Sequence, residues 1–321
     1  MNIIVTGSLA YDHIMVFPGY FKDHILPDKV HVLNVSFLVD HMIKKRGGCA
    51  CNIAYSLALL GERPHIMGTV GEDFDEYRAW LEECGIDTSA IKAIKGELTA
   101  TCTIITDRAD NQITGFYAGA MSQAHILSFK DQHYSDIDLV IISPNDPKAM
   151  VRYVRECHEL GIPYIYDPSQ QIIRLSAEEL IAGTSGSRML VVNDYECEMI
   201  RNKTALSEEE LLNLTEILII TRGEEGSLIK TNEKVIEIPI AVPKQLVDPT
   251  GAGDAYRAGI IKGLIHGYPL EVVGRLGSLT ATYSIEEHGT QTHHFTLSEF
   301  VARYQENFGD TEGLDRLLEL R

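Results

Sequence analysis

Residues 248–255 read DPTGAGDA, and the stretch that follows is compatible with a helix as far as Gly267. Small residues placed before a helix allow successive backbone N–H groups to converge on an anion, and the helix amino terminus adds about half a positive charge. This stretch therefore predicts an anion hole formed by Gly251, Ala252 and Gly253.

An acidic residue, Asp254, directly follows these three residues. A carboxylate beside bound phosphate repels it, unless the carboxylate accepts a proton from the incoming nucleophile. The motif thus predicts that Asp254 is the general base of a phosphoryl transfer. The alternative is that Asp254 only caps the helix, where aspartate is a common residue.

A second glycine-led helix start lies at residues 47–52, which read GGCACN. A glycine pair permits close approach of a ligand to the backbone, and Asn52 offers both a donor and an acceptor to hydroxyl groups. Together with Asp12, which follows the first apolar run, Gly48 and Asn52 form a candidate clamp for a vicinal diol. A bare turn before a helix explains the glycine pair equally well.

Three further segments offer oxygen ligands and turns suited to a nucleotide. Asn193 and Glu196 follow an apolar run and can hold the water ligands of Mg²⁺, although the same spacing suits a helix cap. Residues 221–226, TRGEEG, form a glycine-punctuated turn. Asp248 and Thr250, with carbonyl groups near residues 284–289, are a candidate site for a monovalent cation such as K⁺.

Residues 167–174, DPSQQIIR, place two amides and a guanidinium after another apolar run. Gln170 and Gln171 can recognise the edge of a purine, and Arg174 can contact a phosphate. Phe116 can stack on a base. The alternatives are an ordinary surface loop for the first group and a core strand position for Phe116.

The order of apolar runs predicts an α/β fold with a doubly wound, mostly parallel sheet. Strands are expected at residues 3–6, 65–70, 139–143, 164–167, 189–193 and 217–221. Helices are expected after Gly48, over residues 74–83, from Gly251, and from Pro269 to before Gly289. We expect a single unit over residues 1–321, with a small β-sheet lid at about 13–40 and 91–117 that includes strands at 14–18 and 29–39.

Composition excludes several classes of function. The formal net charge of −18 disfavours binding to nucleic acids, whose phosphates demand clustered Lys and Arg. No run approaches the roughly 20 apolar residues that span a bilayer. The start of the sequence lacks the features of a signal peptide, and the six cysteines are scattered, so we expect a cytoplasmic protein without disulfides.

Taken together, these motifs resemble the ribokinase-like family of sugar and nucleoside kinases, also called the phosphofructokinase-B family. The resemblance rests on the early Asp12, the GG pair followed by Asn52 and the late DPTGAGD loop, and it covers nearly the whole chain. Within the family, the segments GSLAYD, GGCACNIAYSLALLG, GFYAGAM, DPSQQ, DPTGAGDAYRAG and EEHGTQTH are most similar to bacterial adenosine kinases of the mycobacterial type.

This resemblance implies ATP-dependent phosphorylation of the adenosine 5′-hydroxyl to AMP and ADP in purine salvage, with Asp254 as base, and a homodimer. The implied adenosine contacts are Ser8, Asp12, Gly48, Asn52, Phe116, Gln170 and Gln171, and Arg174 would contact phosphate. Asn193 and Glu196 match a magnesium motif, and ATP would contact Asn193, Thr221, Gly223 and Gly226. Cys102 stands where that subgroup has an aromatic residue, which concerns base selectivity.

Three other functions remain open at this point. The chain can be a kinase for another nucleoside, a kinase for ribose or a sugar phosphate, or a non-catalytic nucleoside sensor. The two glutamines and Phe116 favour a base over a bare sugar. Asp254 argues against a sensor, because a pure binder gains nothing from a carboxylate beside phosphate.

Overall fold

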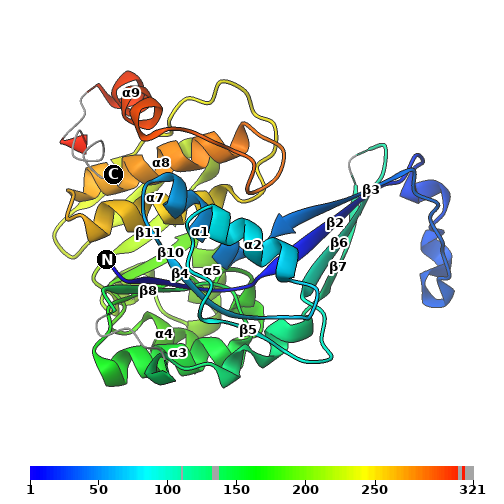
Figure 1. Ribbon diagram of the computed structural model, residues 1–321, viewed down its shortest axis with the longest axis horizontal. Helices are drawn as coiled ribbons and strands as arrows, with labels where there is room; N and C mark the ends of the chain where they lie inside the picture. The colour runs from blue at the N-terminus through cyan, green and yellow to red at the C-terminus, as the bar shows by residue number, and fades with distance from the viewer. Residues whose placement is uncertain (110, 132–136, 310–312, 315–321) are drawn as a thin grey trace.

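The fold is built on a nine-stranded sheet, seen edge-on in Figure 1. The computed structural model describes residues 1–109, 111–131, 137–309 and 313–314. The strand order is β13-β12-β11-β10-β9-β8-β1-β4-β5, and all pairs from β11 to β5 are parallel. The strands are β1 Ile3–Thr6, β4 His65–Val70, β5 Ile91–Ala93, β8 Leu139–Ile142, β9 Tyr164–Tyr166, β10 Met189–Asn193, β11 Leu218–Thr221, β12 Ser227–Lys230 and β13 Val235–Ile238.

Helices cover both faces of this sheet, as the doubly wound prediction requires. One buried cluster joins α1, α2 and α7 to one face, and a second joins α3, α4 and α5 to the other. Alternate residues along β1 point into the two clusters, because side chains alternate along a strand. The helices are α1 Cys49–Leu59, α2 Asp75–Glu83, α3 Pro147–Leu160, α4 Ala177–Thr184, α5 Asp194–Thr204, α6 Glu208–Leu212, α7 Ala252–Ile265, α8 Leu270–Ile285 and α9 Leu297–Phe308.

The winding of the sheet reverses at β1, which lies between β4 and β8. In open parallel sheets such a reversal opens a crevice beyond the carboxyl ends of the strands, and ligands bind there. The chain leaves β1 at Gly7 and Ser8, and the backbone N–H of Ser8 donates to the carbonyl of Pro144 beyond β8 at 2.8 Å. The fold thus places the candidate site at this edge.

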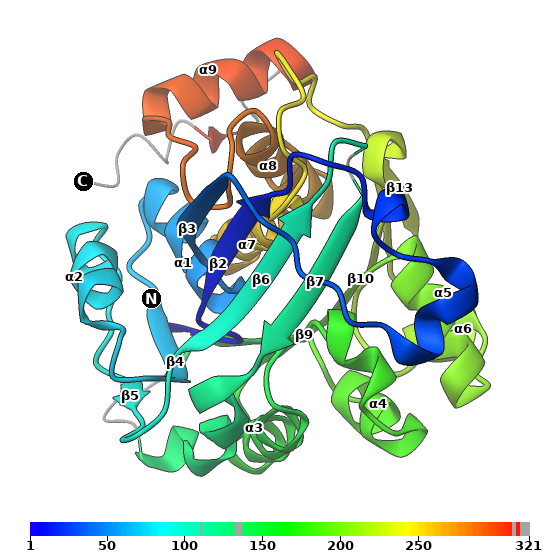
Figure 2. The same ribbon diagram turned by 90° about the vertical axis from the view of Figure 1, so that its right-hand side faces the viewer.

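A second, four-stranded sheet extends from one side of the body (Figure 1) and is seen face-on in Figure 2. Its order is β3-β2-β6-β7, with an antiparallel pair on each side of the parallel β2–β6 pair. The strands are β2 Ala10–Val16, β3 His41–Gly47, β6 Ala100–Thr106 and β7 Gln112–Tyr117. We call this sheet the lid.

The strand expected at residues 29–39 is absent, and this prediction was wrong. The 3-10 helix Pro27–Val32 and irregular chain occupy this segment, and the second early strand of the lid is β3 instead. β-branched composition predicts a strand, but a strand also needs a neighbouring strand to pair with. Here Phe37 packs against Phe17 and Phe21, with ring centroids 4.9 and 5.0 Å apart.

The second stretch expected in the lid, at residues 91–117, is divided between the two sheets. β5 pairs with β4 in the large sheet, while β6 and β7 belong to the lid. In the described part of the chain no helix is long and apolar enough to cross a membrane.

Candidate active site

Two helix amino termini meet at the crevice and carry the central pair of side chains. α1 begins after Gly48 and presents Asn52, and α7 begins after Gly251 and presents Asp254. The amide nitrogen Nδ2 of Asn52 donates to Oδ2 of Asp254 at 2.8 Å. The structure therefore brings together the two glycine-led motifs that lie about two hundred residues apart in the sequence.

A buried hydrogen-bond network orients Asn52 toward Asp254. Nε2 of Gln291 donates to Oδ1 of Asn52 at 2.6 Å, which leaves the amide nitrogen of Asn52 to face the carboxylate. The Tyr77 hydroxyl lies 2.7 Å from Nε2 and 3.0 Å from Oε1 of Gln291. Tyr77, Asn52 and Gln291 are all buried, so this orientation is fixed from behind the site.

The surroundings of Asp254 suit a base that works near neutral pH. Burial away from water raises the pKa of Asp254 to about 6 against the lowering effects of Arg257 and of the Asn52 hydrogen bond, and Asp167 and Asp12 add to the rise. A general base is most effective when its pKa lies near the working pH. Asp254 therefore has the properties of a proton acceptor, and its carboxylate is hydrogen-bonded to Asn52 on another helix.

Arg257 lies one turn beyond Gly253 and forms a buried ion pair with Asp167, which follows β9. Its Nη2 and Nε lie 2.5 Å from the two carboxylate oxygens of Asp167. Burial opposes the charge on Arg257, but the carboxylates of Asp167 and Asp254 raise its pKa above the usual value. This permanent cation lies directly behind the predicted anion hole, since a Cβ added at Gly253 would be 2.7 Å from Nη1 of Arg257.

The glycine pair at residues 47 and 48 has a steric cause. Gly48 has φ of +95°, and a Cβ there would lie 2.5 Å from the carbonyl oxygen of Ser8. A Cβ at Gly47 would lie 2.3 Å from Oδ2 of Asp12. The pair therefore lets α1 start against β1 while the Asp12 carboxylate packs over the backbone.

A row of side chains crosses one face of the lid. In the strand register Asp12 pairs with Lys45 on β3 and with Cys102 on β6, and Cys102 pairs with Phe116 on β7. Residues directly opposite one another on paired strands share a face. Burial raises the pKa of Asp12 to about 6, although Lys45 opposes the rise. The row thus places a carboxylate, a thiol and an exposed aromatic ring side by side.

Three of the four residues expected to contact ATP line one cavity, and the fourth, Asn193, does not line it. This cavity, of about 450 Å³, runs from Thr221, Gly223 and Gly226 at the turn after β11 to Ala252 and Gly253 at the start of α7. Its other walls are mainly apolar, and they include Ile240, Pro243, Leu246, Ala281 and Ile285. A slot with apolar walls that ends at a helix amino terminus fits a planar base at one end and phosphates at the other.

The expected magnesium residues form a complete capping box at the start of α5. Oδ1 of Asn193 accepts from the backbone N–H of Glu196 at 2.7 Å, and Oε2 of Glu196 accepts from that of Asn193 at 2.9 Å. Oε1 of Glu196 accepts from the Ser169 hydroxyl at 2.8 Å. Each oxygen keeps a lone pair for a water molecule, so the pair fits Mg²⁺ held through water rather than directly.

Asp248 links the loop before α7 to the loop after α8. Its two oxygens accept from the backbone N–H groups of Thr250 and Gly289, each at 3.0 Å. Partial burial opposes ionisation, but these hydrogen bonds lower the pKa of Asp248. Asp248 therefore stays ionised and holds the two loops together.

The remaining residues expected to contact the substrate differ in their burial and in their hydrogen bonds. The Ser8 hydroxyl accepts from the backbone N–H of Cys49 at 3.0 Å, at the start of α1. Gln171 is buried, and its Oε1 has no partner among the described residues. Gln170 and Arg174 are exposed, and the Arg174 guanidinium contacts no described polar side chain.

Sequence reasoning missed three residues that shape the site, namely Tyr77, Arg257 and Gln291. Arg257 stands three residues after Asp254, on a helix that was expected, and Gln291 stands in the segment EEHGTQTH. Both residues lie close to motifs that the sequence analysis used. Their hydrogen-bond partners lie on other elements, so their roles could not be inferred without the fold.

A glycine-led helix start that carries a buried carboxylate, beside a cavity that fits a nucleotide, on a doubly wound α/β body with a lid, is the arrangement expected of a kinase that acts on a hydroxyl acceptor. The model of the pfkB family of carbohydrate kinases matches residues 6–296. The chain belongs to this family.

Individual relatives agree with this assignment. A nucleoside kinase of Methanocaldococcus jannaschii is 31% identical over 308 residues, which cover 95% of this chain and 97% of that protein. The structure of the Burkholderia thailandensis nucleoside kinase in complex with inosine has a TM-score of 0.87 at 36% identity and covers 96% of this chain and 99% of that one. A complex of the same kinase described as ADP-inosine has a TM-score of 0.84 at 38% identity, with 96% of each chain covered.

Proposed function

We propose that this chain is an ATP-dependent nucleoside kinase that phosphorylates the 5′-hydroxyl of adenosine, giving AMP and ADP for purine salvage. The observation that carries the proposal is the position of Asp254. It shares the start of α7 with Ala252 and Gly253, which line the nucleotide cavity, and it is hydrogen-bonded to Asn52. Asp254 thus lies between a place for the phosphate donor and a place for a hydroxyl acceptor.

In the proposed reaction the lid and α1 hold the ribose. Asp12 accepts hydrogen bonds from the 2′- and 3′-hydroxyls, and Asn52 and the Gly48 backbone complete the clamp. Asp254 takes the proton of the 5′-hydroxyl as that oxygen attacks the γ-phosphorus of ATP, and the bond to ADP breaks. The N–H groups of Gly251, Ala252 and Gly253, with Arg174, stabilise the developing charge. Closure of the lid excludes water that would otherwise hydrolyse ATP.

Magnesium would be held beside the nucleotide through water by Asn193 and Glu196, and it would neutralise charge on the phosphates. Asp248 and Thr250 remain a proposed site for K⁺. The hydrogen bonds to Asp248 keep it ionised, which a cation site requires.

Two features of the site support an acceptor that carries a nucleobase, as opposed to a bare sugar. The buried, unpartnered Oε1 of Gln171 can accept a hydrogen bond from a ligand, and Phe116 is 53% exposed on the lid beside Cys102. Inosine is the second candidate, because the Burkholderia thailandensis relative was solved with it. Adenosine and inosine differ at the six-position of the purine, where a glutamine amide can serve either one by rotating.

The proposal is tested by ADP release from ATP and magnesium with adenosine, inosine, guanosine, cytidine, ribose and fructose 6-phosphate. We expect adenosine to have the highest kcat/KM. Best turnover with inosine would move the assignment to the second candidate. A response to the sugars alone would overturn the base-binding roles of Phe116, Gln170 and Gln171 and leave the role of Asp254 intact.

A further inference from the structure

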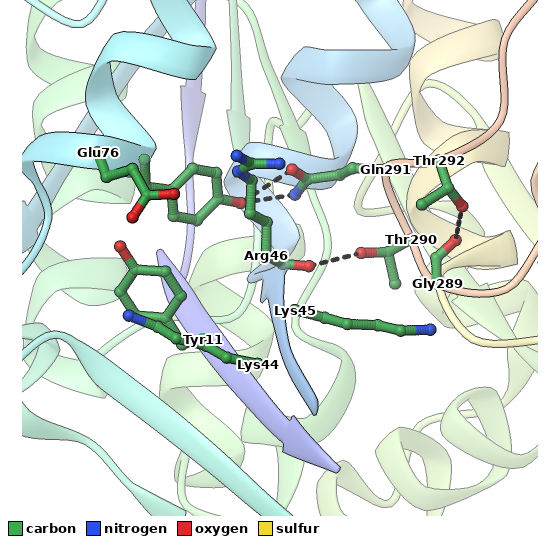
Figure 3. A pocket seen from close by; sticks show the side chains of 10 residues that line it. Tyr11, Lys44, Lys45, Arg46, Glu76, Gly289, Thr290, Gln291 and Thr292 are labelled. Carbon is green, nitrogen blue, oxygen red and sulfur yellow. Dashed lines mark hydrogen bonds between the residues drawn. The ribbon is translucent and has the colours of Figure 1, made fainter. Parts of the chain in front are cut away.

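A separate cavity of about 240 Å³ lies between β3 and residues 289–292, and it shares no lining residue with the nucleotide cavity. Figure 3 shows it from close by. We call it the β3 cavity. Because a water molecule occupies about 30 Å³ in the liquid, this volume can hold a small multiply charged ligand with some of its water.

Three consecutive basic residues of β3, Lys44, Lys45 and Arg46, line the β3 cavity. None of them forms an ion pair with a residue that the structure describes. Among the described residues that line the cavity, Glu76 is the single acidic one, so this lining carries two more positive than negative charges. Asp12 and Asp248 attract Lys45, and Asp73 attracts Lys44, but none of these carboxylates comes within ion-pair distance. In a chain with a formal net charge of −18, three cations gathered at one cavity need an explanation.

The basic groups are held at the cavity rather than free to spread over the surface. Nζ of Lys44 lies 3.5 Å from the centre of the Tyr11 ring, and the Arg46 guanidinium lies 4.4 Å from that of Trp80. Lys45 extends toward Gly289, where an added Cβ would be 3.2 Å from its Nζ (Figure 3). Aromatic faces hold cations in place without neutralising them, which leaves their charge for a ligand.

We propose that the β3 cavity is a second anion-binding site, for a ligand with two or more phosphate-type charges. Binding of this ligand changes the surroundings of Asp254 through Gln291. Gln291 and Tyr77 line this cavity and also belong to the network that orients Asn52 toward Asp254. A ligand that displaces Lys45 or Arg46 moves the wall in which Gln291 sits. The anion site stands by itself; only the link to catalysis rests on the proposed function.

Binding is tested by calorimetric titration of pyrophosphate, without magnesium, into protein saturated with ADP so that the nucleotide cavity is filled. We expect one binding event in the wild type, weakened about tenfold or more in K44A/R46A, since each lost charge-assisted hydrogen bond is a large share of such affinity. The matched control K92A/K95A removes two exposed lysines outside the cavity and should bind like the wild type. Equal affinities in all three proteins, or no binding to the wild type, would overturn the site.

Inorganic phosphate and a nucleoside diphosphate titrated in the same way distinguish a free anion from a nucleotide as the ligand. Failure of ADP to bind would count against the proposed function alone, because the contrast between the two double variants still reports on the β3 cavity.

The link to Asp254 is tested by nucleoside phosphorylation in sodium sulfate against sodium chloride of equal ionic strength, because sulfate is a dianion of similar shape. Wild type and K92A/K95A should show a sulfate-dependent change in rate that K44A/R46A lacks. The same response in all three proteins would overturn the link and leave the binding result to stand by its own test.

Discussion

In its proposed role as general base, Asp254 meets two opposing demands, because a base must be ionised to act, while burial away from water and a neighbouring phosphate would both disfavour ionisation. The structure meets them with one hydrogen bond from Asn52 and with the buried cation of Arg257. Keeping a buried carboxylate ionised costs free energy, and favourable interactions in the rest of the fold must offset this cost.

The first prediction concerns the loss of this base. Asp254→Asn keeps the shape of the side chain but cannot accept the proton, so kcat should fall by about 10²–10⁴. Substrate binding, measured by calorimetry, should change far less. A residual rate within about tenfold of the wild type would show that another group takes the proton.

The same substitution should stabilise the protein at neutral pH. The pKa of Asp254 is about 6 in the folded state against an ordinary value of 3.8, so the stability contributed by its protonated form is lost as the pH rises through 6. Asn removes this loss. The melting temperature of Asp254→Asn should therefore exceed that of the wild type at pH 7.5, and the gap should close below pH 4; a lower melting temperature at pH 7.5 would contradict this account.

The acidic limb of the pH–rate profile should report the same carboxylate. kcat/KM should fall below about pH 6, with a slope steeper than one where Asp12 also protonates, because its pKa is also about 6. Gln291→Leu releases Asn52 from its orientation and weakens the bond that lowers the pKa of Asp254, so this limb should move to higher pH. Gln305→Leu, on the exposed side of α9, is the control, and an unmoved limb in Gln291→Leu would remove Gln291 from the positioning network.

At the scale of elements, the site depends on helices starting against strands without room for a side chain. Gly48 and Gly85 both have positive φ, but a Cβ at Gly48 would clash with Ser8, while one at Gly85 would meet nothing within 4 Å. Gly85→Ala should therefore lose only about 1 kcal/mol of unfolding free energy, the usual cost of a left-handed non-glycine residue. Gly48→Ala should cost more and should raise KM for the nucleoside. Urea unfolding and kinetics of both variants test this. Equal losses of unfolding free energy would show that the positive φ, and not the clash with Ser8, requires glycine at position 48.

The Arg257–Asp167 pair joins α7 to the end of β9. Breaking one partner of a buried pair leaves the other charge uncompensated, so Asp167→Asn should cost about 3–5 kcal/mol of unfolding free energy. The isosteric replacement of both partners, Asp167→Leu with Arg257→Met, should recover much of that stability. Urea unfolding of the single and double variants measures the difference, and a double variant less stable than Asp167→Asn would show that the pair itself stabilises the fold.

At the scale of the whole molecule, apolar residues are exposed on the lid and on the segment that extends from it. Met42 is 61% exposed on β3, and Leu38 is 84% exposed just before it. Such side chains near the edge strand of a small sheet favour association with a second copy. This supports the proposed homodimer.

Light scattering coupled to size-exclusion chromatography tests the dimer. We expect a mass near twice 35.7 kDa for the wild type. Met42→Glu should shift the protein toward the monomer, and Val151→Glu, at a 38% exposed position on α3, should not. A wild type that elutes as a monomer at all concentrations would reject the proposal.

The sequence by itself determined the strands β1, β4 and β10 to the residue, the helices that begin after Gly48 and Gly251, and the doubly wound class of the fold. It did so because apolar periodicity and glycine punctuation are local signals. It also placed Thr221, Gly223, Gly226, Ala252 and Gly253, which the structure gathers around one cavity.

The tertiary structure alone decided which of these segments face one another. It assigned β5 to the large sheet and left residues 29–39 without a strand partner, because strand pairing depends on neighbours that the local sequence does not specify. It also revealed Arg257 behind Gly253, and Tyr77 and Gln291 behind Asn52. These contacts join residues up to 239 positions apart. Such contacts carry no local pattern, because burial and hydrogen-bond geometry arise only when the elements pack.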